Sequence, residues 1–196
     1  DVYKRQAADR ELFPQVRLLH ELLREYSKDE KEYRAYVQSL KNSVLTAFYT
    51  PEPVVTAMQE SLQVPGIRPG RFLDPSAGTG MFISGLKGVP EVHCFEKDKL
   101  TGKILSALYP ESRVAIDGFQ SIQPYYNNYF DMVSSNIPFG NTRVYDRDFD
   151  RSEDVVRKSS LAAVHNYFFL KGMDTLHEGG ILAYITVSYT HLRAHE

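Results

Sequence analysis

The sequence predicts an α/β protein built on a mostly parallel, doubly wound sheet. Three observations carry the prediction. From about residue 71 onward, short apolar runs typical of strands alternate with helical segments. A glycine-rich turn follows the first of these runs, and helical segments precede the whole alternation. Strands that alternate with helices favour parallel pairing, and parallel sheets bind ligands beyond the carboxyl ends of their strands.

Composition limits the class of protein. A length of 196 residues fits one domain, or one domain with an extension. The single cysteine, Cys94, excludes an intramolecular disulfide framework and fits a reducing cytoplasm, where we expect the protein to reside. No apolar run approaches the roughly 18 residues that a membrane span needs. The net charge of −2 argues against a generally basic nucleic-acid binder, so a nucleic-acid role requires a local patch.

Both ends of the chain are expected to be non-native. Residues 1–6 and 188–196 resemble translated sequencing-adapter read-through, and neither segment continues the pattern beside it. Between them we predict a helical extension over 7–46 and a catalytic core over 47–187. The core is expected to be a fragment that is truncated after its fifth strand.

The elements follow in order along the chain. Apolar residues recur at helical spacing over 8–46, with a charged break at 28–31. A further helix begins near Thr50-Pro51 and runs to Gln63, since proline is favoured in a first helical turn. Strands are then predicted at 71–74, 91–96, 113–117, 130–135 and 179–187. Helices are predicted at 80–87, 100–108 and 161–176, and a charged mobile loop at 142–158.

Polar groups or tight turns follow four consecutive strands. They are the turn Asp74–Gly80, Glu96, Asp117 and the tetrapeptide Asn136–Phe139. Because parallel strands end at one edge of a sheet, we expect these groups to lie near one another.

The glycine turn does not match the phosphate-binding loops. Gly78 and Gly80 supply two glycines of a dinucleotide loop, but Ile83 stands where the third is required. Gly80 and Gly85 have the Walker spacing, but Leu86 replaces the lysine. The turn therefore favours a ligand without phosphate.

The carboxylates indicate what that ligand is. Asp74, at the end of the first strand, would repel a polyphosphate and suits an ammonium group. Glu96 can accept hydrogen bonds from both ribose hydroxyls of a nucleoside, and Asp117 can accept from an adenine amino group. An adenosine joined to an amino acid fits all three, which predicts S-adenosylmethionine as the cofactor.

The tetrapeptide suggests the chemistry. The Asn136 carboxamide oxygen and the Ile137 carbonyl could accept both hydrogens of an exocyclic amine, stabilising its developing positive charge. Phe139 offers a face for stacking a planar substrate, and Pro138 restricts the backbone.

These residues, in this order, resemble the amino-group DNA methyltransferases that act on adenine, a family with a Rossmann-like core. Ala47–Pro51 resembles the family's N-terminal motif, and its position first in the chain matches the subgroup in which target recognition follows catalysis. The resemblance implies no metal and assigns Asn136, Ile137, Pro138 and Phe139 to catalysis. It assigns the following residues to the cofactor: Phe48, Tyr49, Thr50, Asp74, Pro75, Ser76, Ala77, Gly78, Gly80, Glu96, Lys97, Asp117, Gly118 and Phe119.

The same resemblance implies the partners. The run Ser43–Pro51 and the variant tetrapeptide look closest to methylase domains of large methylase–helicase proteins from mobile elements. DNA is the implied substrate, its target adenine flipped from the stack, and restriction–modification is a possible setting. A target-recognition or helicase region is expected outside this chain.

Two departures from the family pattern stand out. Ile137 replaces the usual proline, which keeps a carbonyl acceptor and is expected to lower local rigidity. The segment Asp117–Phe119 allows a one-residue offset in the adenine contact.

Alternative functions stay open at this point. The same tetrapeptide geometry suits methylation of a protein glutamine or of cytosine N4, and a non-catalytic DNA-binding or scaffold module could retain the fold. His93 and Cys94 are expected to pack on opposite faces of a strand, and the tyrosines of 125–129 to form a packed turn.

Overall fold

The computed structural model describes residues 2–46, 50–63, 66, 68–86, 88–89 and 91–186, without the side chains of 2–11, 42–46 and 62–63. The chain divides into two compact units, Asp1–Ala47 and Phe48–Glu196. Phe48 and Tyr49, expected to contact the cofactor, lie outside the described residues, as does the expected tail 188–196.

The first unit is a helical hairpin. Helix α1 (Val2–Tyr26) and helix α2 (Glu30–Thr46) are separated near the predicted charged break. Asp29 accepts a hydrogen bond from the backbone N–H of Glu32 at 2.7 Å, as an N-capping residue does. Because α1 begins at Val2, the expected tail over residues 2–6 forms part of this helix.

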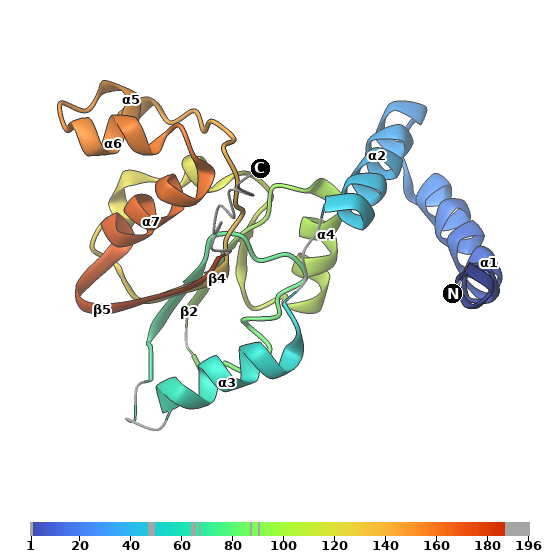
Figure 1. The fold of residues 1–196 in the computed structure, drawn as a ribbon, viewed down its shortest axis with the longest axis horizontal. Coiled ribbons are helices and arrows are strands. Elements are labelled where there is room, and N and C mark those ends of the chain that lie inside the picture. Colours follow the sequence, from blue (N-terminus) through green and yellow to red (C-terminus); the bar gives the residue numbers. More distant parts are fainter. Residues whose placement is uncertain are drawn as a thin grey trace, which may run out of the picture. The chain divides into compact units, whose positions relative to one another are not determined.

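The second unit contains a five-stranded parallel sheet, which confirms the predicted fold class (Figure 1). Its strands are β1 (Arg71–Asp74), β2 (Glu91–Phe95), β3 (Arg113–Ala115), β4 (Phe130–Asn136) and β5 (Leu176–Ile185). Their order is β3-β2-β1-β4-β5, and each neighbouring pair is parallel. The direction of winding reverses between β1 and β4, the place where such sheets bind ligands.

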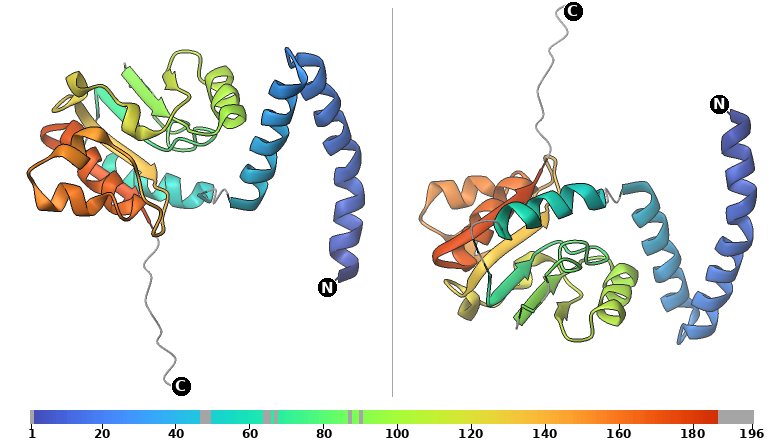
Figure 2. Two further views of the ribbon diagram at one scale, coloured as in Figure 1. Left: turned by 90° about the horizontal axis from the view of Figure 1, so that it is seen from above. Right: turned by 90° about the horizontal axis from the view of Figure 1, so that it is seen from below.

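Helices cover both faces of the sheet (Figure 2). Helix α3 (Glu52–Gln63) packs Val55 against Phe72 and Met132, and α4 (Lys99–Leu108) packs Leu105 against Cys94. Helix α7 (Val164–Thr175) lies on the opposite face.

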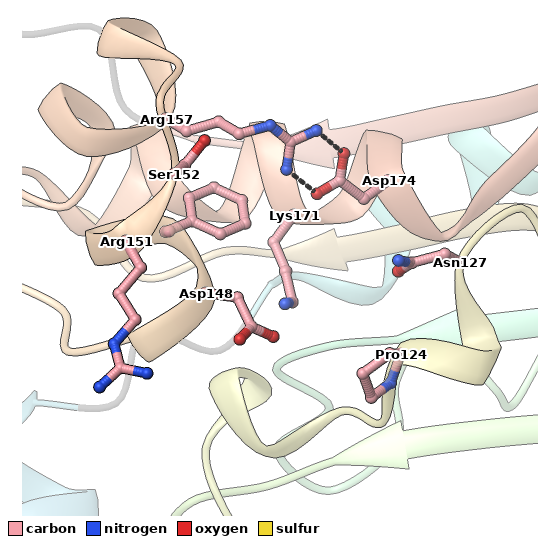
Figure 3. A pocket seen from close by; sticks show the side chains of 9 residues that line it. Pro124, Asn127, Asp148, Arg151, Ser152, Arg157, Lys171 and Asp174 are labelled. Carbon is pink, nitrogen blue, oxygen red and sulfur yellow. Dashed lines mark hydrogen bonds and ion pairs between the residues drawn. The ribbon is translucent and has the colours of Figure 1, made fainter.

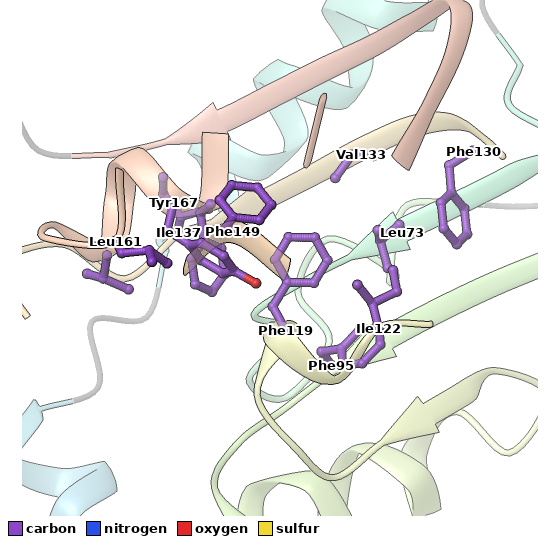
Figure 4. Packing of buried hydrophobic residues seen from close by; sticks show 12 residues of the cluster. Leu73, Phe95, Phe119, Ile122, Phe130, Val133, Ile137, Phe149, Leu161 and Tyr167 are labelled. Atoms are coloured by element: carbon purple, nitrogen blue, oxygen red, sulfur yellow. The ribbon is translucent and has the colours of Figure 1, made fainter. Parts of the chain in front are cut away.

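Aromatic rings fill the space between the sheet and α7 (Figure 4). Phe119, in the short helix η1 (Phe119–Ser121), is 1% exposed. Its ring centroid lies 5.8 Å from that of Phe95, 6.4 Å from that of Tyr167 and 5.3 Å from that of Phe168. Apolar burial here stabilises the connection that leads from β3 to β4.

The predicted helix at 80–87 is wrong. Residues 78–85 form successive turns, in which the Ile83 N–H donates to the Gly80 carbonyl at 3.0 Å. Gly80 has a φ of +90°, outside the helical region, and the Gln59 side chain of α3 donates to the Phe82 carbonyl at 3.1 Å. Tertiary contacts at glycines therefore override the helical pattern.

The predicted loop at 142–158 is also wrong. It contains two short helices, α5 (Arg147–Arg151) and α6 (Val155–Ser160). Asp146 and Asp154 cap them by accepting backbone N–H groups. The charged residues that led to the prediction of a loop thus include the N-caps of two helices.

Two element boundaries also move. Helix α7 begins at Val164, three residues later than predicted, and β5 begins at Leu176 rather than at residue 179. The β4–β5 register shifts between Phe130 and Met132, which accommodates the earlier start.

The packing predicted before β4 is confirmed for Tyr126 and Tyr129, whereas Tyr125 is 70% exposed. The His93 ring lies 4.9 Å from Tyr126 and 5.2 Å from Phe130, whereas Cys94 packs with the α4 cluster on the other face. Across the described residues, no helix has the length and apolar character required to cross a bilayer.

Replacing Phe119 with alanine tests the aromatic core. We expect Phe119→Ala to lower the free energy of unfolding by about 3–5 kcal/mol, because its cavity is enclosed by rings that cannot collapse fully. Urea unfolding measures the loss, with Val155→Ala as control, since Val155 is 76% exposed. The control is expected to change stability by no more than about 0.5 kcal/mol. Equal effects of the two substitutions would contradict this packing.

Candidate functional site

Asp74 ends β1 with a fully buried carboxyl group. One of its oxygens, Oδ1, accepts from the Ser76 N–H at 3.1 Å, and the Ser135 hydroxyl lies beside the carboxyl. Within the described part of the chain, Oδ2 is buried without a hydrogen-bond partner. Burial raises the pKa of Asp74 to about 7, and the nearby charge of Glu96 adds to the rise. A buried acceptor of this kind suits a cationic donor.

The turn after Asp74 needs glycine for two reasons. A Cβ on Gly80 would lie 2.3 Å from a ring carbon of Tyr109, so the turn can approach the end of α4 only without a side chain. Gly78 has a φ of +55°, and a Cβ there would meet nothing within 4 Å. Gly80 therefore allows the turn to pack closely against Tyr109, while Gly78 leaves open space beside the backbone.

Glu96 follows β2 and binds the glycine turn. Its carboxylate accepts from the Gly78 N–H at 2.8 Å and from the Asp98 N–H at 2.7 Å. Burial raises the pKa of Glu96 above its usual range. These contacts fix the carboxylate against the turn, where each oxygen retains further acceptor capacity. Lys97, beside it, is exposed.

The segment after β3 is divided between surface and core. Asp117 is exposed, and its carboxylate accepts from the Gly118 N–H at 2.7 Å. Gly118 is buried, and the ring of Phe119 belongs to the aromatic core. A contact from Phe119 to a ligand would therefore involve its backbone rather than its ring.

The tetrapeptide lies where β4 ends. Asn136 is the last residue of β4, and the Ile137 N–H extends the ladder by donating to the Ile185 carbonyl at 3.1 Å. The Ile137 side chain is 1% exposed within the aromatic core. Pro138 is exposed and Phe139 is half-buried. The N–H that isoleucine has and proline lacks thus makes a hydrogen bond that a proline could not.

Two groups that sequence reasoning missed lie beside Asp74. Ser135 is fully buried, and its hydroxyl donates to the Ser76 carbonyl at 3.3 Å beside the Asp74 carboxyl. The Tyr184 hydroxyl is buried without a partner among the described residues, and both burial and the Asp74 charge raise the pKa of Tyr184. Two consecutive serines between the apolar pair Met132-Val133 and Asn136 were a usable signal for Ser135.

The structure brings together part of the predicted set. Hydrogen bonds join Asp74 to Ser76 and Gly78 of the same turn to Glu96, and Ser135, which was not predicted, donates to Ser76. Pro75 and Ala77 are buried within the same turn, and Thr50 is buried just before α3. In the described ranges, no three His, Cys, Asp or Glu residues group to hold a metal ion.

A separate cavity of about 370 Å³ lies among α5, α6, α7 and η2 (Pro124–Tyr126), as Figure 3 shows. Three of its charged side chains are paired. The Arg157 guanidinium donates twice to Asp174 at 2.5 Å, and the Lys171 ammonium lies 3.1 Å from Asp146. None of the sequence-predicted site residues lines it, so we assign these charges to the packing of α5 and α6 on α7.

Comparison with known proteins identifies one curated relative. No family model matches the chain. Over 147 residues the chain is 31% identical to the Defense against restriction protein B of Escherichia phage P1. The match covers 72% of this chain, which spans only about 6% of that protein's length.

Solved structures identify the fold. A Vibrio vulnificus protein assigned as the modification subunit of a type I restriction enzyme superposes with a TM-score of 0.54 at 18% identity, over 79% of this chain and 37% of that one. A Listeria monocytogenes protein assigned as a class I S-adenosylmethionine-dependent methyltransferase gives 0.57 at 18% identity, over 83% and 55%. This chain therefore has the Rossmann-like fold of S-adenosylmethionine-dependent methyltransferases.

Proposed function

We propose that this chain is a methyltransferase core that transfers methyl from S-adenosylmethionine to the N6 amino group of adenine in DNA. One observation carries the proposal. Asp74 ends β1, Glu96 directly follows β2 and Asn136 ends β4, and these three strands are adjacent around the point where the sheet reverses its winding. The first two provide acceptors for a cationic nucleoside, and the third provides acceptors for an amine.

The residues present fit the cofactor. The unpartnered Oδ2 of Asp74 would accept from the ammonium group, and the Glu96 carboxylate from the ribose hydroxyls. Open space at Gly78 allows the backbone to approach the ligand closely. Asp117 would accept from the cofactor adenine, and Thr50 would cover the methionine end together with Phe48 and Tyr49. When bound, S-adenosylmethionine supplies an electrophilic methyl group.

The tetrapeptide would prepare the acceptor amine. The Asn136 carboxamide oxygen and the Ile137 carbonyl would accept its two hydrogens, which withdraws the nitrogen lone pair from conjugation with the ring. Phe139 would stack on the base, and Pro138 would limit the backbone conformations. Two anchors hold Ile137 in place, its bond to Ile185 and its buried side chain.

The comparisons with known proteins, rather than the geometry of the site, support DNA as the substrate. The Vibrio structural neighbour is assigned to a type I restriction enzyme, and the phage relative is named for defence against restriction. We therefore propose a restriction-related or mobile-element role in the cytoplasm, with target recognition or a helicase supplied by a further region of a longer protein. Methylation of a base in duplex DNA requires that the base be flipped from the stack.

Cofactor binding is expected to depend on Glu96. Glu96→Gln places an amide NH2 against backbone N–H donors, so we expect the Kd for S-adenosylmethionine to rise roughly 10- to 100-fold. Titration calorimetry on the full chain measures it. Glu111→Gln is the matched control, because Glu111 is exposed beyond α4, and should leave the Kd unchanged. Equal Kd values for the unsubstituted chain and both variants would show that Glu96 does not bind the cofactor.

Cofactor binding is also expected to release a proton from Asp74. Its pKa of about 7 leaves most of the free protein protonated at pH 6, and an adjacent ammonium favours the carboxylate. The release should therefore approach one proton at pH 6, and affinity should rise with pH up to about 7. Calorimetry in buffers of different ionisation enthalpy counts the protons.

Asp74→Asn is the control for this linkage and should abolish the release. A binding enthalpy that is independent of the buffer in the unsubstituted chain would contradict the assignment. At pH 6 an α-amino group is already protonated, so the ligand's own titration does not mask the result.

Methyl transfer tests the acceptor. With labelled S-adenosylmethionine and adenine-containing DNA, we expect N6-methyladenine by nucleoside analysis, and Asn136→Ala to lower kcat at least about 100-fold with little change in cofactor Kd. N4-methylcytosine, or label in a protein glutamine, would redirect the acceptor assignment. Binding of cofactor and DNA without any transfer would favour a non-catalytic module.

A further inference from the structure

A row of exposed side chains follows the tetrapeptide. Residues 143–147, which end at the first residue of α5, alternate in exposure: Arg143, Tyr145 and Arg147 are exposed, whereas Val144 is half-buried and Asp146 is 5% exposed. Such alternation is that of extended chain, and Asp146 has an extended φ of −132° and ψ of 119°. We call Arg143, Tyr145 and Arg147 the basic–aromatic row.

The inward residues hold this row rigidly. The Val144 N–H donates to the Leu161 carbonyl at 2.9 Å, and its side chain packs on the core cluster that includes Ile137. Asp146 accepts from the Tyr167 hydroxyl at 2.7 Å and lies 3.1 Å from the Lys171 ammonium. Tyr145 therefore stands between two anchored neighbours, and its exposure does not arise from a loosely held chain.

The side chains of the basic–aromatic row contribute little to the packing of the protein itself. Tyr145 is 78% exposed, so its ring contributes little to the core. The Arg143 guanidinium lies 3.9 Å from the Asp150 carboxylate, but both side chains are more than half exposed, and such pairs are weak. Within the described residues, no ion pair is recorded for Arg147. The row thus presents two cations and a ring to a partner.

The row also lies close to the proposed active site along the chain. Tyr145 follows Phe139 by six residues, which limits their Cα separation to about 20 Å. In extended chain, Arg143 and Arg147 would stand about 13 Å apart, with the tyrosine between them.

We propose that the basic–aromatic row grips the DNA strand beside the target base. Tyr145 stacks on a neighbouring base, and Arg143 and Arg147 bind the flanking phosphates. Aromatic rings on which bases stack, combined with cations that follow the backbone, are the usual chemistry of single-strand recognition. This inference rests on the proposed DNA substrate. The acidic residues of α5, Asp148 and Asp150, offset the local positive charge, so the row positions a strand rather than attracting DNA from a distance.

Because the sequence contains no tryptophan, a tryptophan introduced by substitution is a specific fluorescent probe of its own position. Tyr145→Trp introduces a single tryptophan into the row, and its fluorescence should be quenched when an adenine-containing single-stranded DNA oligonucleotide stacks on it. Tyr125→Trp is the matched control, because Tyr125 is 70% exposed but precedes β4, at the opposite end of that strand from the tetrapeptide. The anisotropy of fluorescein-labelled oligonucleotide measures binding independently in the full chain.

Substitutions that remove the contacts complete the test. We expect Tyr145→Ala to raise the oligonucleotide Kd about tenfold. Tyr145→Phe should keep the Kd of the unsubstituted chain, since the ring rather than the hydroxyl stacks. Arg143→Gln with Arg147→Gln should lower the slope of log K against log salt by about 1.4, the value for two phosphates on a single strand.

The outcomes separate this proposal from the proposed function. Quenching confined to Tyr145→Trp supports the row. DNA binding with equal fluorescence in both tryptophan variants would overturn the row and leave the DNA substrate standing. No change in anisotropy with the unsubstituted chain would also overturn the row, whereas the DNA substrate is tested separately by methyl transfer.

Discussion

Parallel pairing of β1 with both β2 and β4 is the constraint on which the candidate site depends. Because β1 lies at the centre of the sheet, its last residue, Asp74, lies beside the ends of strands that are distant in sequence. Buried apolar clusters on both faces fix this arrangement. Chemistry-bearing residues therefore occur at turns, while the residues that position them lie within the strands.

The buried Asp74 carboxyl is not arranged to stabilise the fold. Burying a carboxyl with one unpartnered oxygen disfavours its ionised form, and the raised pKa of Asp74 expresses that cost. The Ser76 N–H compensates only Oδ1. A cationic ligand would complete the hydrogen bonding, so the strained group and the proposed binding role have one physical origin.

Sequence reasoning predicted the elements whose patterns are local. The five strands and the break between α1 and α2 follow from apolar periodicity, and Glu96 and Asn136 were proposed as site residues because each directly follows or ends a strand. Tertiary contacts decided the rest. The turns at 78–85 depend on Gln59 and Tyr109, and α5 depends on an Asp146 whose other partners, Tyr167 and Lys171, are about 20 residues away. No local window contains those partners.

The central claim is that separate strand ends form one cofactor site, and hydrogen–deuterium exchange with and without S-adenosylmethionine tests it most directly. The account predicts slower exchange at once in the peptides that contain 74–80, 96–98, 117–119 and 136–139, with no change around Lys171 and Asp174 in the cavity beneath α5 and α6. Protection confined to that cavity, or no protection at saturating cofactor, would contradict it.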